Sequence, residues 1–315
     1  MQSISTYVKH PDIFLSTIVV SLGALLPDKL YLKLLYRLKM GYWPNLRNPK
    51  TFSEKLQWLK LYDHNPKYTA MVDKIMAKEY VSKIIEDKYI IPTIGVWSNF
   101  DEIDFEKLPE RFVLKTNNGG GNNGVVICKD KTCFDIEKAR VKLTKSMKQN
   151  IYKTHREWPY KNVKSKIFAE KFLEEIKSPN KRDLDDYKWY CFNGEPKYCQ
   201  VIQGRSTRET IDFFDLNWNH QEFVGLQSVA GVTLGNVFRN AEILPSRPTC
   251  LEEQIEIARQ LSKELPFSRI DLYEVNENVY FGEITFFPLS GFGEFNPKQY
   301  NLLLGEMLTL PCKNN

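Results

Sequence analysis

Residues 268–291 of this chain read SRIDLYEVNENVYFGEITFFPLSG. Two runs rich in aliphatic and aromatic residues flank the polar triplet Asn276-Glu277-Asn278, which is the pattern of a β-hairpin. A three-residue loop over this triplet fixes which residues face each other. Counting back from that loop pairs Val275 with Val279, Asp271 with Glu283 and Arg269 with Thr285.

This register would gather polar chemistry on one side of the hairpin. Side chains alternate between the two faces of a strand, so two carboxylates, a guanidinium and a hydroxyl would share one face. Like charges directly opposed on a sheet are destabilising, which suggests a cation between Asp271 and Glu283. Carboxylate ligands suit Mg²⁺ that carries nucleotide phosphates. A two- or four-residue turn is the alternative, and it would place the two acids on opposite faces.

The composition is that of a folded globular chain. Its 315 residues are 42% hydrophobic and 26% charged, and this length has room for two or three subdomains. The net charge of +5 suits anionic ligands without requiring nucleic acid. The six cysteines form no Cys-x-x-Cys and no zinc-like spacing with the four histidines, so we expect reduced thiols in a cytosolic protein. The scattered histidines indicate no Ser-His-Asp or Cys-His nucleophile.

The N-terminal part contains the apolar segment IFLSTIVVSLGALL, residues 13–26. It is shorter than the ~20 apolar residues of a membrane span. A signal peptide is not expected either, because little positive charge precedes the segment and no small-residue cleavage site follows it. Residues 26–43 are basic and helical in period. A pair of packed helices is the favoured interpretation, and the alternative is a peripheral membrane contact through residues 13–43.

A glycine-rich turn, TNNGGGNNG, lies between two predicted strands, Phe112–Lys115 and Val125–Ile127. Glycines let the backbone approach phosphates closely and expose its amide groups. The turn is not a P-loop, because no Gly-Lys-Ser/Thr follows and the next element is a strand. A flexible surface turn is the alternative, although Lys115 directly before the loop favours phosphate binding.

The chain as a whole predicts an α+β fold in three parts. Residues 1–91 form a helical N-terminal region, residues 92–166 a small α+β unit with the glycine-rich turn, and residues 167–315 a larger α+β unit. We expect a short helix around 101–107 and a lysine-rich helical tract over 129–166. The lysines are interpreted as a solvated face, with a patch for an acidic chain as the alternative. A second sheet is predicted from strands at 167–173, 186–192 and 197–203, with a turn at Asn193-Gly194 between the last two, and it is later joined by the hairpin. The apolar spacing of residues 251–265 predicts an amphipathic helix.

The order of these features resembles the ATP-grasp superfamily. It runs from Lys74, through Lys115 before the glycine-rich hairpin, AEKFL at 169–173 and Asp-x-Lys, to Arg205 and the Arg-Ile-Asp…Glu-Ile-Thr of the hairpin. Phrases such as NPKTFSEKLQWLKLYDHNP, REWPYKNVKSKIFAEKFL and PFSRIDLYEVNENVYFGEITFFPLSGFGEFNP resemble the teichuronopeptide-biosynthesis type, found in bacterial surface polysaccharide pathways. The likeness spans about residues 28–311. It implies an ATP-grasp fold, in which two α+β subdomains clamp ATP between antiparallel sheets.

The resemblance also implies roles for individual residues on the nucleotide side. Phosphates would be contacted by Lys74, Lys115 and Arg205, and covered by a lid of Gly119, Gly120 and Gly121. The adenine would be held through backbone groups of Glu170, Lys171, Phe172 and Leu173. The Asp-x-Lys motif, Asp186 and Lys188, would lie at the ribose and phosphates.

On the metal side, the resemblance makes Asp271 and Glu283 the Mg²⁺ ligands, with Thr285 beside them. Many ATP-grasp enzymes have asparagine at the position of Thr285, so either water completes the shell or one metal alone is held firmly. Arg269 would stabilise the charge of a tetrahedral intermediate, with Lys188 and Arg205 as the other catalytic cations. The early chain lacks the strand–helix–strand unit of the usual substrate-binding domain, and we expect the acceptor-side loop at 288–296.

The implied activity is ATP- and Mg²⁺-dependent ligation. The γ-phosphate passes to a carboxylate, and an amine attacks the acylphosphate to form an amide. By resemblance, the carboxylate belongs to a hexuronic acid, free or nucleotide- or lipid-linked, and the amine to an amino acid or small amine. No nucleic acid is expected, and the location would be cytoplasmic or at the inner face of the bacterial membrane. The alternatives are an ATP-grasp kinase for a sugar or polyol hydroxyl, and a binding module without turnover.

Overall fold

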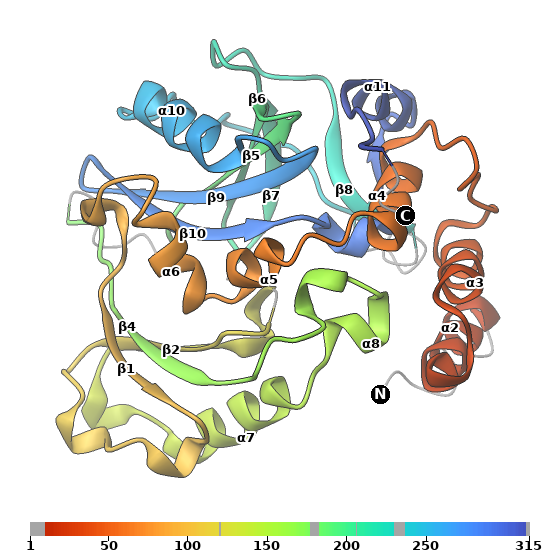
Figure 1. Cartoon of the computed structure of the whole chain (residues 1–315). Helices are drawn as coiled ribbons and strands as arrows, with labels where there is room; N and C mark the ends of the chain where they lie inside the picture. The colour runs from red at the N-terminus through yellow and green to blue at the C-terminus, as the bar shows by residue number, and fades with distance from the viewer. Residues whose placement is uncertain (1–9, 120, 177–182, 206, 230–236, 313–315) are drawn as a thin grey trace.

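The computed structural model describes residues 10–119, 121–176, 183–205, 207–229 and 237–312. Within these ranges the strands form a four-stranded, a five-stranded and a two-stranded sheet, and all pairs of neighbouring strands are antiparallel. The two larger sheets lie in different halves of the molecule, with helices around them (Figure 1). The α+β class and the helical N-terminal region are therefore confirmed.

The chain begins with helices. They are α2 (Pro11–Ser21), α3 (Asp28–Met40), α4 (Phe52–Tyr62), α5 (Lys67–Val72) and α6 (Met76–Val81). The first two lie at one edge of the molecule, whereas α4, α5 and α6 lie against the five-stranded sheet (Figure 1). No helix of the described residues is long and apolar enough to cross a membrane.

The four-stranded sheet has the order β1-β4-β2-β3. Its strands are β1 (Thr93–Trp97), β2 (Phe112–Thr116), β3 (Val125–Cys128) and β4 (Ile167–Lys171). Helix α7 (Ile136–Met147) packs on one face and closes a small core around Leu114 and Leu143. The prediction that residues 167–173 join the second sheet is wrong, because β4 pairs with β1 and β2.

The five-stranded sheet has the order β10-β9-β5-β6-β7. Its strands are β5 (Asp186–Phe192), β6 (Glu195–Gln203), β7 (Thr210–Phe214), β9 (Phe267–Val275) and β10 (Asn278–Thr285). Helix α10 (Leu251–Ser262) covers one face, as its apolar spacing predicts. The predicted Asn193-Gly194 turn between β5 and β6 is confirmed, and both residues have positive φ.

The remaining elements close the second half of the molecule. The two-stranded sheet pairs β8 (Val224–Ser228) with β11 (Gly293–Asn296), and α11 (Gln299–Met307) follows it. A short η8 turn (Pro288–Gly291) connects the β9–β10 hairpin to β11. The predicted helix around residues 101–107 is wrong: two 3₁₀ turns, Phe100–Glu102 and Phe105–Lys107, stand there. The tract 129–166 contains α7 and α8 (Ile151–His155).

The hairpin β9–β10 has a shorter loop than predicted. Asn278 pairs with Val275, so the turn contains two residues, Asn276 and Glu277, with φ of 52° and 61°. These left-handed values match the two-residue turns that suit the twist of a hairpin. The prediction of a three-residue loop is therefore wrong, and this turn alone would put the two acids on opposite faces.

A β-bulge at Gly282 restores the register. The pairing shifts between Phe281 and Glu283, and beyond the shift Glu283 faces Asp271 and Thr285 faces Arg269. A Cβ at Gly282 would lie 3.0 Å from the carbonyl oxygen of Asp271, so the partner strand leaves little room there for a side chain. The predicted pairing of the two acids is confirmed, with the bulge supplying the residue that the turn lacks.

Candidate active site

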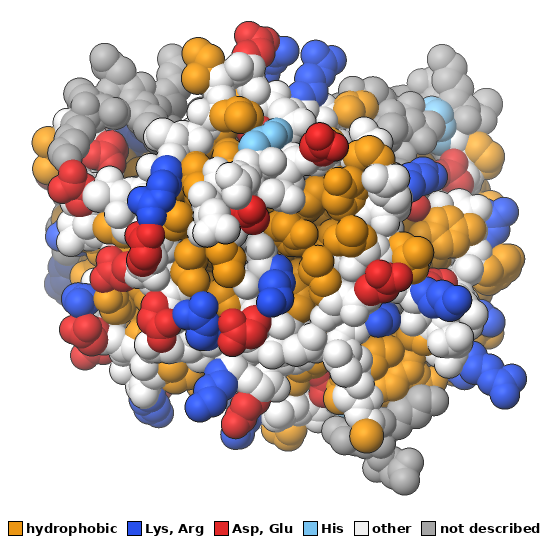
Figure 2. Space-filling view, turned by 90° about the horizontal axis from the view of Figure 1, so that it is seen from above, with side chains coloured by type: hydrophobic (Ala, Val, Ile, Leu, Met, Phe, Trp, Pro, Cys, Tyr) orange, Lys and Arg blue, Asp and Glu red, His pale blue; other side chains and the backbone are white. Residues whose placement is uncertain are grey.

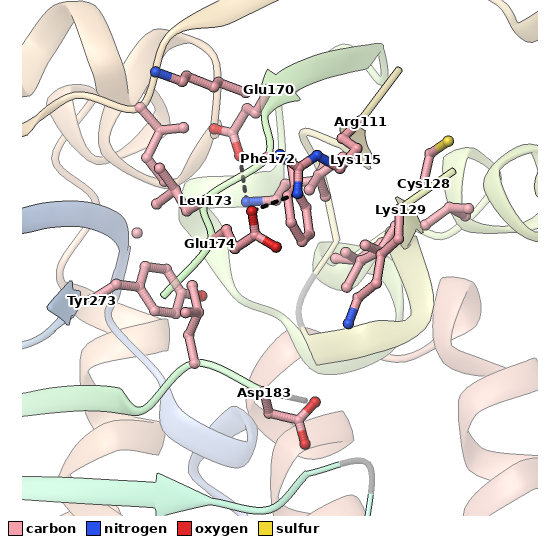
Figure 3. Close-up of a pocket in the computed structure, with 18 of the residues that line it drawn as sticks. Arg111, Lys115, Cys128, Lys129, Glu170, Phe172, Leu173, Glu174, Asp183 and Tyr273 are labelled. Carbon is pink, nitrogen blue, oxygen red and sulfur yellow. Dashed lines mark hydrogen bonds and ion pairs between the residues drawn. The ribbon is translucent and has the colours of Figure 1, made fainter. Parts of the chain in front are cut away.

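A cavity of about 1000 Å³ lies where the two larger sheets face each other. Side chains of β2, β3 and β4 form one wall and those of β5, β9 and β10 the other, and Figure 3 looks into it. Most of the predicted nucleotide and metal residues line this cavity. They are Lys74, Lys115, Glu170, Lys171, Phe172, Leu173, Asp186, Lys188, Arg205, Asp271 and Glu283. Residues distant in the sequence are thus brought to one place.

Three predicted metal ligands converge on a single atom of Arg269. Its Nη2 lies 2.7 Å from Asp271 Oδ2, 3.1 Å from Thr285 Oγ1 and 3.4 Å from Glu283 Oε1. Arg269 Nε also donates to Asp271 Oδ1 at 2.6 Å. Two carboxylates and a hydroxyl therefore point at one position. An octahedral Mg²⁺ uses such a donor set together with water and phosphate oxygens, so the donor set fits this ion. Within the described part of the chain no cluster of three or more His, Cys, Asp or Glu side chains forms a metal site.

Further cations contact the same carboxylates. Lys74 forms an ion pair with Glu283, and Lys188 forms one with Asp271. Lys188 Nζ also lies 3.0 Å from Asp186 Oδ1. Burial works to raise the pKa of Glu283, but Lys74, Lys188 and Arg269 outweigh it and hold this pKa below its ordinary value. Glu283 is therefore a carboxylate at neutral pH.

Arg205 has a buried N–H donor that lacks a hydrogen-bond acceptor among the described residues. Its Nη2 lies 2.6 Å from Asp186 Oδ2, while its Nε is buried and has no hydrogen-bond partner among the described residues. Buried donors are nearly always satisfied, so a ligand oxygen is the natural partner for this one. This ionic group contains four cations and three anions. The cations are Lys74, Lys188, Arg205 and Arg269, and the anions are Asp186, Asp271 and Glu283. Its excess of one positive charge favours an anionic ligand.

A second ionic group lies on the opposite wall. Glu170 of β4 is 4% exposed and pairs with both Lys115 and Lys78, each at 2.5 Å. Burial works to raise the pKa of Glu170, but the two ammonium groups lower it below its ordinary value. Figure 3 shows Lys115 beside Glu170, with Phe172 and Leu173 following along the strand end. Lys78 was missed from the sequence. It lies in α6, four residues after Lys74, which precedes that helix and pairs with Glu283 on the other wall.

The glycine-rich turn is only partly described. Gly119 is buried, Gly121 begins a 3₁₀ turn that ends at Gly124, and Gly120 lies outside the described residues. A Cβ at Gly119 would lie 3.1 Å from Thr116 Oγ1, so the loop packs closely on the end of β2. Gly119 is not among the residues that line the cavity. The role of the three glycines as a lid stays a prediction.

A buried polar cluster holds the loop that follows β10, where the acceptor side is predicted. Lys60 of α4 is 2% exposed and donates to the carbonyl oxygen of Ser290 at 2.6 Å. Ser290 Oγ donates in turn to Glu157 Oε1 at 2.6 Å, and Gln57 Nε2 donates to the carbonyl oxygen of Gly291 at 2.8 Å. Burial lowers the pKa of Lys60 to about 7, even though Glu157 acts in the opposite direction. None of Gln57, Lys60 and Glu157 was predicted from the sequence as a site residue.

The backbone of this loop explains why it needs such support. Leu289, Ser290 and Gly291 all have φ between 46° and 65°. Non-glycine residues avoid this left-handed region, so such a conformation persists only where neighbouring groups hold it. Helix α4 and Glu157 supply those groups from outside the hairpin. The result is a fixed loop immediately after the strand that carries Glu283 and Thr285.

Comparison with known proteins places these observations in a family. The profile of the TupA-like ATPgrasp family matches residues 54–309, which is most of the chain and includes every element around the cavity. The chain belongs to this ATP-grasp family. The expected ATP-grasp fold is thus confirmed. For this chain, ligase activity and the use of ATP and Mg²⁺ belong to the proposed function. No curated protein matches the sequence.

Solved ATP-grasp ligases show distant likeness. A D-alanine–D-alanine ligase from Helicobacter pylori is 16% identical, with 76% of this chain and 61% of that chain covered and a TM-score of 0.37. The Bacillus anthracis D-alanine–D-alanine ligase complexed with ATP is 14% identical, with coverages of 69% and 53% and a TM-score of 0.37. The ATP-grasp ligase PsnB with minimal precursor, Mg and ADP is 11% identical, with coverages of 81% and 65% and a TM-score of 0.38. This chain thus spans less than two thirds of each, and TM-scores this low add nothing to the family assignment.

Proposed function

We propose that this ATP-grasp protein is an ATP-dependent carboxylate–amine ligase working through an acylphosphate. The observation that carries the proposal is the convergence of Asp271, Glu283 and Thr285 on one point. Asp271 and Glu283 also line the cation-rich cavity, whereas Thr285 is not among its lining residues. Phosphoryl transfer depends mainly on positioning and charge neutralisation, which such a site supplies. No protein nucleophile is needed, because the substrate carboxylate attacks the γ-phosphorus itself.

Each wall of the cavity has a proposed share in binding ATP. Lys74, Lys115 and Arg205 would contact the phosphates, and the buried Nε of Arg205 would gain the acceptor that it lacks. The strand end Glu170 to Leu173 would hold the adenine through its backbone, while the Glu170 side chain keeps Lys78 and Lys115 in place. Asp186 and Lys188 would lie at the ribose and phosphates, under the glycine-rich lid of Gly119 to Gly121.

At the reacting end, Asp271, Glu283 and Thr285 would hold Mg²⁺. When bound, this ion would neutralise phosphate oxygens and orient the γ-phosphate for in-line attack. The Arg269 guanidinium would move from the position where the three oxygens converge. It would then face the charge that develops when the amine adds to the acylphosphate. Lys188 would support the same charge. The loop held by Lys60 and Glu157 would form the acceptor side.

The substrates and location are proposed from the family resemblance. We propose a hexuronic acid carboxylate, free or nucleotide- or lipid-linked, and an amino acid or small amine, joined during capsule, O-antigen or cell-wall polysaccharide synthesis. The proposed location is the cytoplasm, at or near the inner face of the membrane. The division into residues 1–91, 92–166 and 167–315 also remains a proposal, with the qualification that β4 completes the first sheet.

The test is incubation of the protein with ATP, Mg²⁺, a UDP-uronic acid and a pool of amino acids. Amine-dependent release of ADP together with an amide product, identified by mass spectrometry, is the expected result. ADP with a stable phosphosugar would replace the ligase with a sugar kinase. Neither product, with any of several uronic acids, would contradict turnover of this substrate class.

A further inference from the structure

Asp73 lies between α5 and α6 and directly precedes Lys74. The side chain is buried, and its two carboxylate oxygens have different partners. Oδ1 accepts from the backbone N–H of Ile75 at 2.9 Å and from that of Met76 at 3.3 Å, which fixes the start of α6. Oδ2 accepts from Asn117 Nδ2 at 2.8 Å. One carboxylate therefore shapes the backbone around Lys74 and also reaches a separate segment of the chain.

Asn117 directly follows β2 and stands at the start of the glycine-rich turn. It is 1% exposed, and both ends of its side-chain amide are bonded. Nδ2 donates to Asp73 and, at 2.9 Å, to the carbonyl oxygen of Lys164. Oδ1 accepts from the backbone N–H of Lys166 at 2.7 Å. This single amide thus joins three segments that are distant in the sequence.

These contacts connect the two lysines that are proposed to bind phosphate. The carbonyl oxygen of Asn117 accepts from the backbone N–H of Lys74 at 3.3 Å. Lys115 lies two residues before Asn117 and pairs with Glu170 on the four-stranded sheet, whereas Lys74 pairs with Glu283 on the five-stranded sheet. The backbone of Lys74 is therefore attached to one wall of the cavity, and its side chain crosses to the other.

The residues on either side of Asn117 are held separately. Thr116 Oγ1 lies 2.8 Å from Ser146 Oγ, and Asn118 Nδ2 donates to the carbonyl oxygen of Gln149 at 3.0 Å. Both contacts are made to α7 or to the residues just after it, and α7 packs on the four-stranded sheet. Asn117 therefore rests on a fixed support, which lets it hold the Lys74 segment in place.

We propose that Asn117, through Asp73, is a positioning residue for Lys74 in the binding of the terminal phosphates of ATP. The inference rests on the proposed function, in which Lys74 contacts phosphate, and it assigns a role to two further residues. Neither Asp73 nor Asn117 is among the residues that line the cavity, so neither would touch the nucleotide. They would act by holding the Lys74 ammonium group ready at the phosphate end, which lowers the ordering cost of binding.

Two near-isosteric variants break the same hydrogen bond with opposite changes in charge. Asn117→Asp puts a carboxylate oxygen opposite Asp73 Oδ2 and adds a negative charge. Asp73→Asn puts an N–H group opposite Asn117 Nδ2 and removes a negative charge, while its remaining oxygen can still cap α6. We expect both variants to weaken MgATP binding at least about fivefold in isothermal titration calorimetry. An effect of charge alone would have opposite signs in the two variants.

A double-mutant cycle tests whether the effect passes through Lys74. Lys74→Met should itself weaken MgATP binding about tenfold or more. In that background Asp73→Asn should change the Kd by less than about twofold, because the ammonium group that it positions is gone. AMP lacks the two terminal phosphates, so the single variants should bind it within about twofold of wild type. A general loosening of the fold would weaken the binding of both nucleotides.

A pair of the same chemistry elsewhere provides the control. Asn219 Nδ2 donates to Asp215 Oδ2 at 2.9 Å, and Asp215 Oδ1 accepts from the backbone N–H of Asn217 at 2.9 Å, as Asp73 Oδ1 does from that of Ile75. Asn219 is exposed. Acidic and basic side chains are interspersed on the face seen from above, so surface charge is mixed there (Figure 2). Asn219→Asp and Asp215→Asn should leave the Kd for MgATP within about twofold of wild type.

Three results would overturn the proposal. They are unchanged MgATP binding in both single variants, changes of opposite sign in the two, and equal losses for MgATP and AMP. Circular dichroism checks the fold, and Asp73→Asn keeps the test open if Asn117→Asp does not fold. A wild-type protein that binds no MgATP would contradict the proposed function and this inference together. Normal wild-type binding with unaltered variants would remove this inference alone.

Discussion

Glu283 contacts Lys74 and Arg269 and faces Asp271 across the hairpin, so its charge is central to the site. We expect Glu283→Gln to reduce ATP-dependent ADP release by about 10²-fold or more, because an amide cannot replace a charged oxygen ligand or hold Lys74. The steady-state rate of ADP release measures this. The matched control is Glu137→Gln on α7, whose side chain is 77% exposed. Undiminished activity of Glu283→Gln would remove Glu283 from the site.

Glu170 is expected to stabilise the fold as well as to hold Lys78 and Lys115 in position, because it pairs with both lysines. We expect Glu170→Gln to lower the free energy of unfolding at pH 7 by about 3 kcal/mol, since two nearly buried cations lose their partner. Urea denaturation measures the difference. The exposed pair Arg111–Glu174 gives the control, and Glu174→Gln should cost less than about 1 kcal/mol.

The comparison of wild type with Glu170→Gln also predicts the direction in which the stability difference changes with pH. The pKa of Glu170 is lower in the folded than in the unfolded chain, so its stabilisation is fully present above the unfolded pKa of about 4.3. This stabilisation is lost as the pH falls through the lower pKa that Glu170 has in the folded chain. The stability difference between wild type and Glu170→Gln should therefore shrink between pH 5 and the acid limit of the fold, to about zero. A difference that stays constant with falling pH would show that Glu170 does not act through its charge.

At the scale of elements, the bulge at Gly282 decides whether the hairpin can form the site. Deleting Gly282 would remove the extra residue and turn either Glu283 or the preceding part of β10 to the other face. We expect loss of ADP release to below about 1% of wild type, with a lowered melting temperature. Glu277→Gly is the control, because glycine adopts the left-handed φ of 61° in the turn more easily than glutamate. An active deletion variant would show that the register is not set by the bulge.

The elements that the sequence predicted well are those whose pattern is local. Alternation predicted the hairpin strands, and the Asn-Gly pair predicted the turn at Asn193-Gly194. The apolar spacing of residues 251–265 predicted the helix found at Leu251–Ser262. The loop length was wrong because a polar triplet does not show which of its residues still pairs. An isolated glycine inside a strand does signal a bulge, so Gly282 held the missing information.

The errors that remain concern contacts between distant segments. Strand β4 was assigned to the wrong sheet, since its partners β1 and β2 precede it by 50 or more residues and leave no mark on its own sequence. The cluster of Lys60, Glu157 and Ser290 joins three separate segments and could not be found from any one of them. Lys78 was missed because its partner Glu170 had been considered only for its backbone.

At the scale of the whole molecule, the proposed ATP site lies between two sheets, so nucleotide would bind only the folded chain with both halves in place. We expect MgATP at 100 times its Kd to add about 2.7 kcal/mol to the free energy of unfolding. The melting temperature should rise by about 4 °C for a chain of this size. Differential scanning fluorimetry measures it. ATP with EDTA should give a smaller rise, and Arg205→Met should reduce it while the same change at Arg208, whose side chain is 70% exposed, should not.

The guanidinium of Arg269 has a consequence for the protein before any substrate arrives. Because this side chain already balances Asp271 and Glu283, the opposed acids do not repel one another when the divalent ion is missing. Chelation of the divalent ion should then abolish activity, while the melting temperature of the nucleotide-free protein should not change. The divalent ion would bind and leave with each turnover, and the fold would stay unchanged in its absence.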